Sequence, residues 1–297
     1  MPAMALGDSA DPGRVQLVRI LDEAAARLSL AGVSSARLDA ELMMAHAAGT
    51  TRVAILAWPA AISSAALERF EAMMSRRSAR EPLAYILGTK EFYSLDLDVT
   101  PAVLIPRPET EFLVAAALEF TAQRPDARVL DIGSGSGAIA IAIAANAPRV
   151  SLVAADIAED ALAVARRNVV RHHLEDRIAL RWADIFTPLD GGGALGDFDL
   201  IVSNPPYIEA SAIDSLEPEV RDYEPLGALA AGADPLECYR RIAAGAGEHL
   251  RRGGAVMVEI GARQAGAVCA LFREAGLHVT GVINDLAGIA RVVTARV

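Results

Sequence analysis

A glycine-rich segment near the middle of the chain restricts the possible folds more than any other feature. Gly133-Ser134-Gly135-Ser136-Gly137 follows the strand-like run Arg128 to Ile132 and precedes the helix-like run Ala138 to Ala147. Glycines permit a tight turn and let a ligand approach the backbone, and a helix start offers unpaired N–H groups. The segment therefore predicts a strand, a ligand-binding loop and a helix, the repeating unit of open α/β sheets.

Acidic residues stand at the ends of successive strand-like runs. Ser151 to Ala155 is followed by Asp156, about 20 residues past the loop, where a carboxylate can accept from both hydroxyls of a ribose. Asp131 precedes the first glycine, and Asp184 follows the run Ile178 to Trp182. We expect Asp131 to meet a methionine amino group and Asp184 to accept from an adenine amine. Each carboxylate could instead cap a loop or face solvent.

The glycine loop alone fits two cofactors. Gly133, Gly135 and Ala138 also match the G-x-G-x-x-A form of the dinucleotide fingerprint, so NAD stays open on that motif. The carboxylates Asp131 and Asp184 favour S-adenosylmethionine instead, because this cofactor carries both a methionine amine and an adenine.

The segment Asn204-Pro205-Pro206-Tyr207 directly follows the apolar run Phe198 to Val202. A residue before proline is restricted to extended geometry, so the segment leaves the strand stiff. The Asn204 side-chain oxygen and the Pro205 carbonyl can then accept the two hydrogens of one NH₂ group, while Tyr207 covers its flat face. The segment predicts a clamp for an amide or an exocyclic amine that accepts a methyl group. A proline-rich turn that merely ends a strand is the alternative.

Alternating strands and helices continue to the end of the chain. Gly253-Gly254 leads into the strand Ala255 to Ile260, and a helix follows through Ala275. The strand-like runs Leu277 to Ile283 and Ala290 to Val297 are joined by a short connection, which favours antiparallel pairing. We predict an α/β, Rossmann-like fold with a mostly parallel sheet of seven strands, similar to class I S-adenosylmethionine-dependent methyltransferases.

The chain resembles the release-factor glutamine N5-methyltransferase family, PrmC, also called HemK. The resemblance extends over nearly the whole chain. Its motifs are the glycine loop, the Asn-Pro-Pro-Tyr segment, Pro82 to Gly88, Glu91-Phe92, Leu104 to Glu111 and Asp285 to Gly288.

This resemblance implies an enzyme that uses S-adenosylmethionine to methylate the side-chain amide of the glutamine in the Gly-Gly-Gln motif of peptide-chain release factors. Residues 1–100 would form an N-terminal helical substrate-recognition domain with a hairpin linker, and residues 101–297 the catalytic domain. Catalysis is expected from Asn204, Pro205, Pro206 and Tyr207. Cofactor binding is expected from Asp131, Gly133, Ser134, Gly135, Ser136, Gly137, Asp156, Asp184, Ile185 and Asn204. Some relatives carry Trp in place of Ile185, so the adenine pocket would lack one aromatic wall.

The N-terminal part predicts a small helical bundle followed by a hairpin. The apolar residues that recur there at helical spacing are Val15, Val18, Leu21, Ala25, Leu28, Leu38, Leu42 and Ala45. Alternation from Glu91 to Val99 predicts the hairpin, and the proline-rich junction that follows sets the domain boundary near residue 100. Arg107, Glu109 and Glu111 in the junction either border the acceptor site or form structural ion pairs.

The net charge helps to separate the candidate acceptors. The chain has 28 Lys and Arg against 38 Asp and Glu, a net charge of -10, whereas nucleic-acid binding needs cationic contacts with phosphates. An adenine-N6 nucleic-acid methyltransferase is therefore disfavoured, although it would use the same clamp. A glutamine of a large-subunit ribosomal protein is the other possible target, and the run Ile105 to Glu111 favours release factors. A non-catalytic S-adenosylmethionine-binding protein would not need the clamp.

Neither a membrane location nor a metal site is expected. Met1 to Ala10 lacks a leader pattern, and no apolar run approaches the ~18 residues of a membrane span. Cys238 and Cys269 have no metal-ligand spacing, and His172 and His173 lack partners at such spacing. We expect a cytoplasmic, monomeric enzyme whose partners are release factors and which makes no direct contact with nucleic acid.

Overall fold

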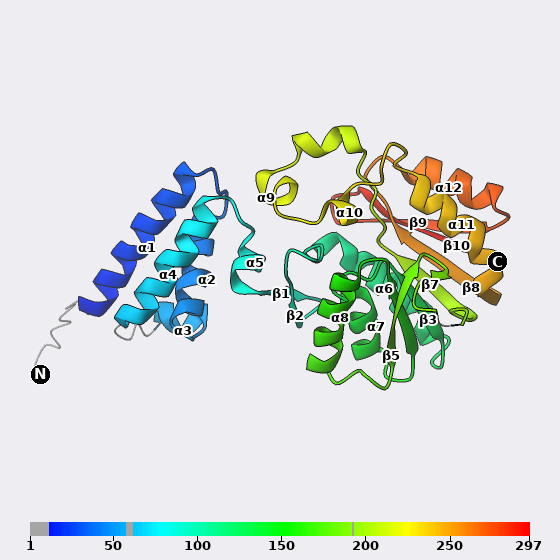
Figure 1. Cartoon of the computed structure of the whole chain (residues 1–297), viewed down its shortest axis with the longest axis horizontal. Coiled ribbons are helices and arrows are strands. Elements are labelled where there is room, and N and C mark those ends of the chain that lie inside the picture. Colours follow the sequence, from blue (N-terminus) through cyan, green and yellow to red (C-terminus); the bar gives the residue numbers. More distant parts are fainter. Residues whose placement is uncertain (1–11, 58–61, 192) are drawn as a thin grey trace, which may run out of the picture. The chain divides into compact units, whose positions relative to one another are not determined.

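The computed structural model describes residues 12–57, 62–191 and 193–297, so the start Met1 to Ala10 lies outside the described residues. The chain divides into two compact units, Met1–Leu87 and Gly88–Val297 (Figure 1). None of the helices in the described ranges has the length and hydropathy that a membrane span requires.

The first unit is helical, as the apolar spacing predicts. Its helices are α1 (Pro12–Leu30), α2 (Ala36–Ala47), α3 (Arg52–Ala57), α4 (Ser64–Ser78) and α5 (Leu83–Leu87). Helix α4 begins after Ser63, whose hydroxyl accepts a hydrogen bond from the Ala66 N–H at 3.2 Å and so caps the helix. One apolar core, built mainly from α1, α2 and α4, holds the unit together.

The buried face of the first helix matches the predicted one only in part. The predicted Leu21 and Leu28 are buried, both at 0%, whereas the predicted Val15 and Val18 are exposed, at 55% and 42%. Leu17, which was not predicted, is buried at 3%. Two apolar rows overlap on α1, and only the row that faces α2 and α4 enters the core. Periodicity locates such rows but does not identify the packed one.

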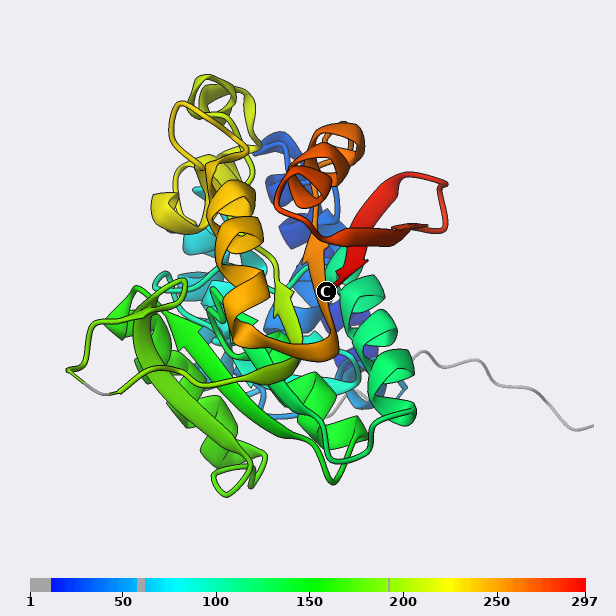
Figure 2. The same cartoon turned by 90° about the vertical axis from the view of Figure 1, so that its right-hand side faces the viewer.

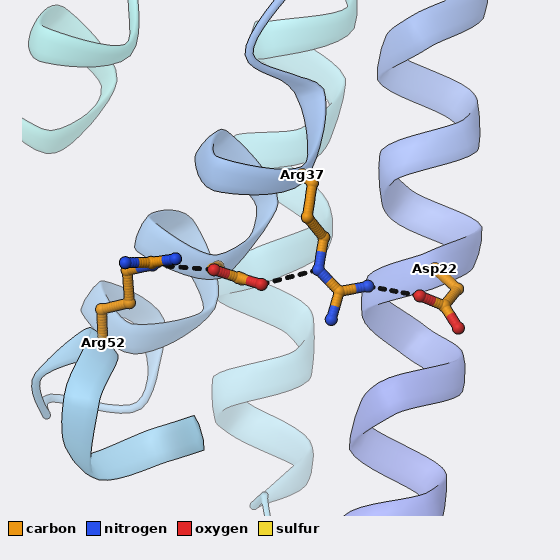
Figure 3. Close-up of polar contacts among 4 residues, drawn as sticks. Asp22, Arg37 and Arg52 are labelled. Atoms are coloured by element: carbon orange, nitrogen blue, oxygen red, sulfur yellow. Dashed lines mark hydrogen bonds and ion pairs between the residues drawn. The ribbon is translucent and has the colours of Figure 1, made fainter. Parts of the chain in front are cut away.

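A polar network joins α1, α2 and α3 of this unit (Figure 3). Glu41 on α2 is 5% exposed and accepts from Arg37 at 2.6 Å and from Arg52 at 2.7 Å. Arg37 also pairs with Asp22 on α1. Burial by itself would raise the pKa of Glu41, but the hydrogen bonds from the two arginines outweigh it and lower that pKa. The Glu41 carboxylate therefore stays charged. It contacts α3 through Arg52, and it is connected to α1 through Arg37, which pairs with Asp22.

The second unit contains a small hairpin and one large sheet. The hairpin strands are β1 (Thr89–Phe92) and β2 (Leu95–Asp98). The sheet has the order β6-β5-β4-β3-β7-β8-β10-β9. Its strands are β3 (Arg128–Ile132), β4 (Ser151–Asp156), β5 (Ile178–Asp184), β6 (Thr187–Pro188), β7 (Phe198–Ser203), β8 (Leu250–Glu259), β9 (His278–Asn284) and β10 (Ala290–Arg296). The predicted seven-stranded, mostly parallel sheet is confirmed, and β6 adds a two-residue antiparallel edge.

Helices cover both faces of this sheet (Figure 2). The helical segments of the unit are η1 (Pro108–Thr110), α6 (Glu111–Ala122), α7 (Ala138–Asn146), α8 (Glu159–Arg171), η2 (Ala210–Ser215), α9 (Pro218–Arg221), α10 (Leu226–Leu229), α11 (Glu237–His249) and α12 (Ala265–Glu274). Successive strand residues enter opposite cores: Val129 packs with α6 and α7, and Leu130 packs with α11 and α12. Because both faces are buried, the central strands read as continuous apolar runs.

The hairpin packs within the second compact unit, since the two units separate between Leu87 and Gly88. Phe92 and Leu97 enter the core formed with α6 and α7. The last residue of β2, Asp98, exchanges two hydrogen bonds with Asn168 on α8, at 2.6 and 2.9 Å. These contacts join residues distant in sequence, which a pattern of alternation does not reveal.

Asn168 offers a test of this packing. Its side chain is fully buried, and its Nδ2 also donates to the Ser136 carbonyl of the glycine loop at 2.9 Å. We expect Asn168→Ala to lower the free energy of unfolding by roughly 2 to 3 kcal/mol, because the buried Ser136 carbonyl and the partly buried backbone groups of Asp98 would lose their partner. Urea unfolding followed by circular dichroism measures the change.

Asn146 is a matched control for this variant, since it is exposed and lies at the end of α7. Asn146→Ala should change the free energy of unfolding by no more than about 0.5 kcal/mol. Equal losses in the two variants would show that Asn168 does not hold the hairpin to the glycine loop.

Candidate active site

The predicted site residues lie at one edge of the sheet, where its parallel strands end. Ile132, the last residue of β3, pairs with Ala155 on one side and with Ser203 on the other. The Ser203 hydroxyl, which is fully buried, donates to the Ile132 carbonyl at 2.8 Å. Gly133 and Asn204 therefore leave neighbouring strands at the same level, which is where open α/β sheets bind ligands.

The glycine loop requires glycine for two separate reasons. Gly133, Gly135 and Gly137 have φ values of 71°, 56° and 80°, a region that other residues seldom adopt. A Cβ at Gly133 or Gly135 would meet nothing within 4 Å, so open space lies beside these two residues. A Cβ at Gly137 would lie 3.2 Å from Ile141 and 3.4 Å from Ala165, so this glycine also permits helix packing.

Asp156 holds the glycine loop in place. Its Oδ2 accepts from the Gly135 N–H at 2.8 Å and its Oδ1 accepts from the Ala158 N–H at 2.9 Å. Burial raises the pKa of Asp156, and these backbone hydrogen bonds oppose the rise. Each carboxylate oxygen can accept more than one hydrogen bond, so this arrangement is compatible with the predicted contact to ribose hydroxyls.

Asp131 lies beneath the loop. It is 0% exposed, and its Oδ2 accepts from the Ala140 N–H in the first turn of α7 at 3.2 Å. Asp131 Oδ1 and the Ser134 hydroxyl are buried without a hydrogen-bond partner in the described parts of the chain. Burial, with the nearby charge of Asp156, raises the pKa of Asp131 to about 7. The structure thus shows a helix-capping carboxyl, and its contact with a methionine amine stays a prediction.

The last residue of β5, Asp184, forms an ion pair. Asp184 Oδ2 lies 2.8 Å from Arg241 on α11, so its contact with an adenine amine also stays a prediction. Ile185 has a φ of 56°, which is rare for a β-branched residue and marks local strain. Ile157 directly follows Asp156 and is 60% exposed. Sequence reasoning missed Ile157, although an apolar residue next to the acidic strand end was a signal.

The Asn-Pro-Pro-Tyr segment presents two carbonyl-type oxygens. Asn204 Nδ2 donates to the Thr110 hydroxyl at 3.1 Å, which leaves Oδ1 on the other side of the amide. No hydrogen bond to Asn204 Oδ1 or to the Pro205 carbonyl is found within the described residues. Both acceptors needed for the predicted clamp are thus present.

Gln264 fastens the far end of this segment. Its Nε2 donates to the Tyr207 carbonyl at 3.0 Å, and its Oε1 accepts from the Gly261 N–H at 2.9 Å. The Tyr207 hydroxyl lies 3.5 Å from Glu259 Oε1, and burial raises the pKa of Tyr207 to about 12. Tyr207 is therefore a neutral phenol, and its role in covering the acceptor group stays a prediction.

Two further residues at the site, in addition to Ile157, were not predicted from the sequence. Thr110 is 4% exposed, and Glu259 at the end of β8 is 1% exposed. Burial raises the pKa of Glu259 to about 7. A carboxylate in the otherwise apolar run Ala255 to Ile260 was the available signal, because buried charges need a structural or chemical reason.

The charged residues of the junction make structural contacts. Arg107 pairs with Glu224, whose carboxylate also accepts from the Ile105 N–H at 3.2 Å. Glu111 accepts from the Tyr93 N–H at 3.1 Å, and Glu109 lies 3.7 Å from Arg291. These contacts bear out the structural ion-pair interpretation for Arg107 and Glu109, while a further role at the border of the acceptor site stays a prediction. In the parts of the chain that the structure describes, no three potential metal ligands come together.

The sheet order, the glycine loop and the clamp segment define a class I methyltransferase. Two family models match the chain: "PrmC N-terminal domain" over residues 19–88 and "Methyltransferase small domain" over residues 109–217. The catalytic domain of hMettl16, solved in complex with a 3′UTR hairpin, has the same fold, with a TM-score of 0.55 and 18% identity over 75% of this chain and 81% of that chain.

Closer relatives identify the family. A release factor glutamine methyltransferase of Geobacter sulfurreducens is 42% identical over 94% of this chain and 96% of its own length. A solved structure from Alicyclobacillus acidocaldarius, a release-factor-specific protein-(glutamine-N5) methyltransferase, is 34% identical over 67% of this chain and 98% of that chain, with a TM-score of 0.40. The chain belongs to the release factor glutamine methyltransferase family.

Proposed function

We propose that this protein transfers a methyl group from S-adenosylmethionine to the side-chain amide nitrogen, N5, of the glutamine in the Gly-Gly-Gln motif of peptide-chain release factors. The observation that supports this most is a pair of acceptors, Asn204 Oδ1 and the Pro205 carbonyl, at the sheet edge that also carries the glycine loop; neither has a hydrogen-bond partner among the residues that the structure describes. A primary amide has two N–H groups, so it matches two acceptors.

The cofactor site is proposed from the residues around the glycine loop. Open space lies beside Gly133 and Gly135, and the Ser134 hydroxyl has no hydrogen-bond partner in the described part of the chain. Both features suit a polar ligand that lies against the backbone. Asp156 would accept from the ribose hydroxyls, while Ile157 and Ile185 would flank the adenine. When bound, S-adenosylmethionine supplies an activated methyl group on a positively charged sulfur.

The main task of the protein's residues is then to orient the acceptor amide toward the methyl group. An amide nitrogen is a weak nucleophile because its lone pair is delocalised into the carbonyl. Asn204 and the Pro205 carbonyl would hold the NH₂ group in a fixed direction, so that proximity and polarisation supply most of the rate. The nitrogen becomes acidic as its new bond forms, so a proton can leave to the clamp or to water without a strong base.

The helical unit Met1–Leu87 is proposed to recognise the release factor. Its match to the PrmC N-terminal domain supports this role. The protein is proposed to act as a cytoplasmic monomer on protein substrates.

One assay tests the proposed activity against its alternatives. The enzyme is incubated with labelled S-adenosylmethionine and, in parallel, with purified release factors, a large-subunit ribosomal protein and DNA, and the modified residue is mapped by mass spectrometry. Label on the Gly-Gly-Gln glutamine is the expected result. Label confined to ribosomal protein or to DNA would contradict the proposal.

A further inference from the structure

The backbone of the clamp segment has few groups that can hold it in place. Pro205 and Pro206 have no N–H, so they cannot donate to a neighbouring element. From Pro205 to Tyr207, the one backbone group with a hydrogen-bond partner among the described residues is the Tyr207 carbonyl, which accepts from Gln264 Nε2 at 3.0 Å. The next residue, Ile208, pairs with the chain at the end of α10. Gln264 is therefore the hydrogen-bond contact between the clamp segment and the start of α12.

Gln264 is itself held by the backbone around the start of α12. Its N–H donates to the Gly261 carbonyl at 2.9 Å, and its carbonyl accepts from the Val268 N–H at 2.9 Å. Val268 is fully buried in the core that contains residues of β8 and α12. The glutamine side chain thus starts from a fixed point, and what remains to be set is the orientation of its amide.

Two backbone groups of opposite kind set that orientation. Gln264 Oε1 accepts from the Gly261 N–H at 2.9 Å, whereas Nε2 donates to the Tyr207 carbonyl at 3.0 Å. A backbone N–H only donates and a carbonyl only accepts, so the reversed amide would lose both hydrogen bonds. The hydroxyl of Tyr239, which is fully buried, lies 3.2 Å from the same Oε1 and 3.0 Å from the Glu259 carbonyl. The oxygen of the Gln264 amide therefore has a second donor beside it.

The glycine at position 261 leaves room for this amide. A Cβ on Gly261 would lie 2.9 Å from Gln264 Oε1 and 3.4 Å from Cδ2 of the Tyr207 ring. At the shorter distance one of the atoms has to move, and the end of the glutamine side chain is the part that can. The φ of Gly261 is not in the left-handed region, so its backbone would accept alanine. Space for the Gln264 amide is thus what a side chain at this position would remove.

We propose that Gln264 is a positioning residue for methyl transfer, which acts through the Tyr207 carbonyl, and that Gly261 provides the space it needs. Proline fixes φ and a residue before proline is extended, so the clamp segment is stiff, and a displacement at Tyr207 also moves the Pro205 carbonyl. Strand β7 holds the other end through Ser203. The inference rests on the proposed role of the Pro205 carbonyl as half of the clamp, and it adds what keeps this carbonyl in its direction.

Gln264→Glu tests the donor without changing the shape of the side chain. The carboxylate can still accept from Gly261, but it turns an oxygen toward the Tyr207 carbonyl and cannot donate to it. We expect kcat on a release factor to fall roughly 10-fold, the effect of about one lost hydrogen bond, while KM changes by no more than about 3-fold. Calorimetry with S-adenosylmethionine gives its dissociation constant, which should not change, and the number of binding sites, to which kcat is normalised.

Gln123→Glu is the matched control, since it makes the same change of charge at an exposed glutamine at the end of α6. Its kcat should equal that of the unmodified enzyme. Full kcat in Gln264→Glu, an equal loss in Gln123→Glu, or a loss of cofactor affinity as large as the loss of kcat overturns the inference.

A pair of glycine variants tests the same contact from the other side. Gly261→Ala should push the Gln264 amide away from the Tyr207 carbonyl and lower kcat per cofactor site by about 3-fold or more. Gly266→Ala is the control, because a Cβ at this exposed position in α12 would meet nothing within 4 Å. Unchanged kcat in Gly261→Ala, or equal losses in the two variants, contradicts the inference.

Asn204→Ala separates this inference from the proposed clamp. If Asn204→Ala loses turnover while Gln264→Glu keeps full kcat, the clamp stands and the positioning role fails. If a folded Asn204→Ala protein keeps its turnover, the clamp fails and the positioning role fails with it.

Discussion

Replacing Asn204 by alanine is expected to lower turnover on a release factor by roughly 10²-fold or more, while the affinity for S-adenosylmethionine stays within a few-fold. The variant removes the Oδ1 acceptor, an interaction that matters most when the amide nitrogen attacks, and loss of one such transition-state contact has effects of this size. Single-turnover transfer of labelled methyl measures the rate, and calorimetry measures the affinity.

The fold of this variant needs its own control, because Asn204 Nδ2 also contacts Thr110. A melting temperature close to that of the unmodified protein would show that the loss is chemical. Turnover at the unmodified rate in a folded Asn204→Ala protein would refute the clamp.

Asp156→Ala should act on the cofactor instead. We expect its dissociation constant for S-adenosylmethionine to rise roughly 10- to 10²-fold, because the change removes the proposed ribose contact and frees the Gly135 N–H from its 2.8 Å hydrogen bond. Hydrogen bonds to charged groups contribute about 1.5 to 3 kcal/mol each, which corresponds to this range. Calorimetric titration with the cofactor measures the effect directly.

Asp160 provides the matched control, since it is an exposed carboxylate in the first turn of α8, close to Asp156 in sequence. Asp160→Ala should leave the dissociation constant unchanged. An unchanged constant in Asp156→Ala would remove Asp156 from the cofactor site, whereas equal losses in both would point to a general charge effect.

Most of the fold of the catalytic unit was predictable from local patterns. The run Arg128 to Ile132 and the glycines after it identify a buried parallel strand and its loop, because both faces of such a strand are apolar and only glycine tolerates the φ values that follow. The hairpin was also predictable as an element. Its attachment through Asp98 and Asn168 was not, because that contact spans 70 positions in the chain.

The candidate site was predictable where backbone chemistry carries the signal. The extended Asn204-Pro205-Pro206-Tyr207 segment and the acidic strand ends follow from residue type and spacing. The burial and the ion-pair partner of each side chain were not predictable in this way. Asp131 is enclosed beneath the loop and Asp184 is paired with Arg241, because tertiary neighbours compete for the same carboxylates.

The amino-acid sequence by itself therefore determined the class of fold and the edge of the sheet where such folds bind ligands, and it predicted the residues of the clamp. These properties depend on backbone freedom and on apolar periodicity, which act over short stretches of chain. Only the tertiary structure decided which partner the Asn204 amide takes, because Thr110 comes from a distant segment and meets Asn204 only after the sheet has formed. The partner of a polar side chain depends on which donors and acceptors lie beside it, and folding brings these groups together from distant parts of the chain.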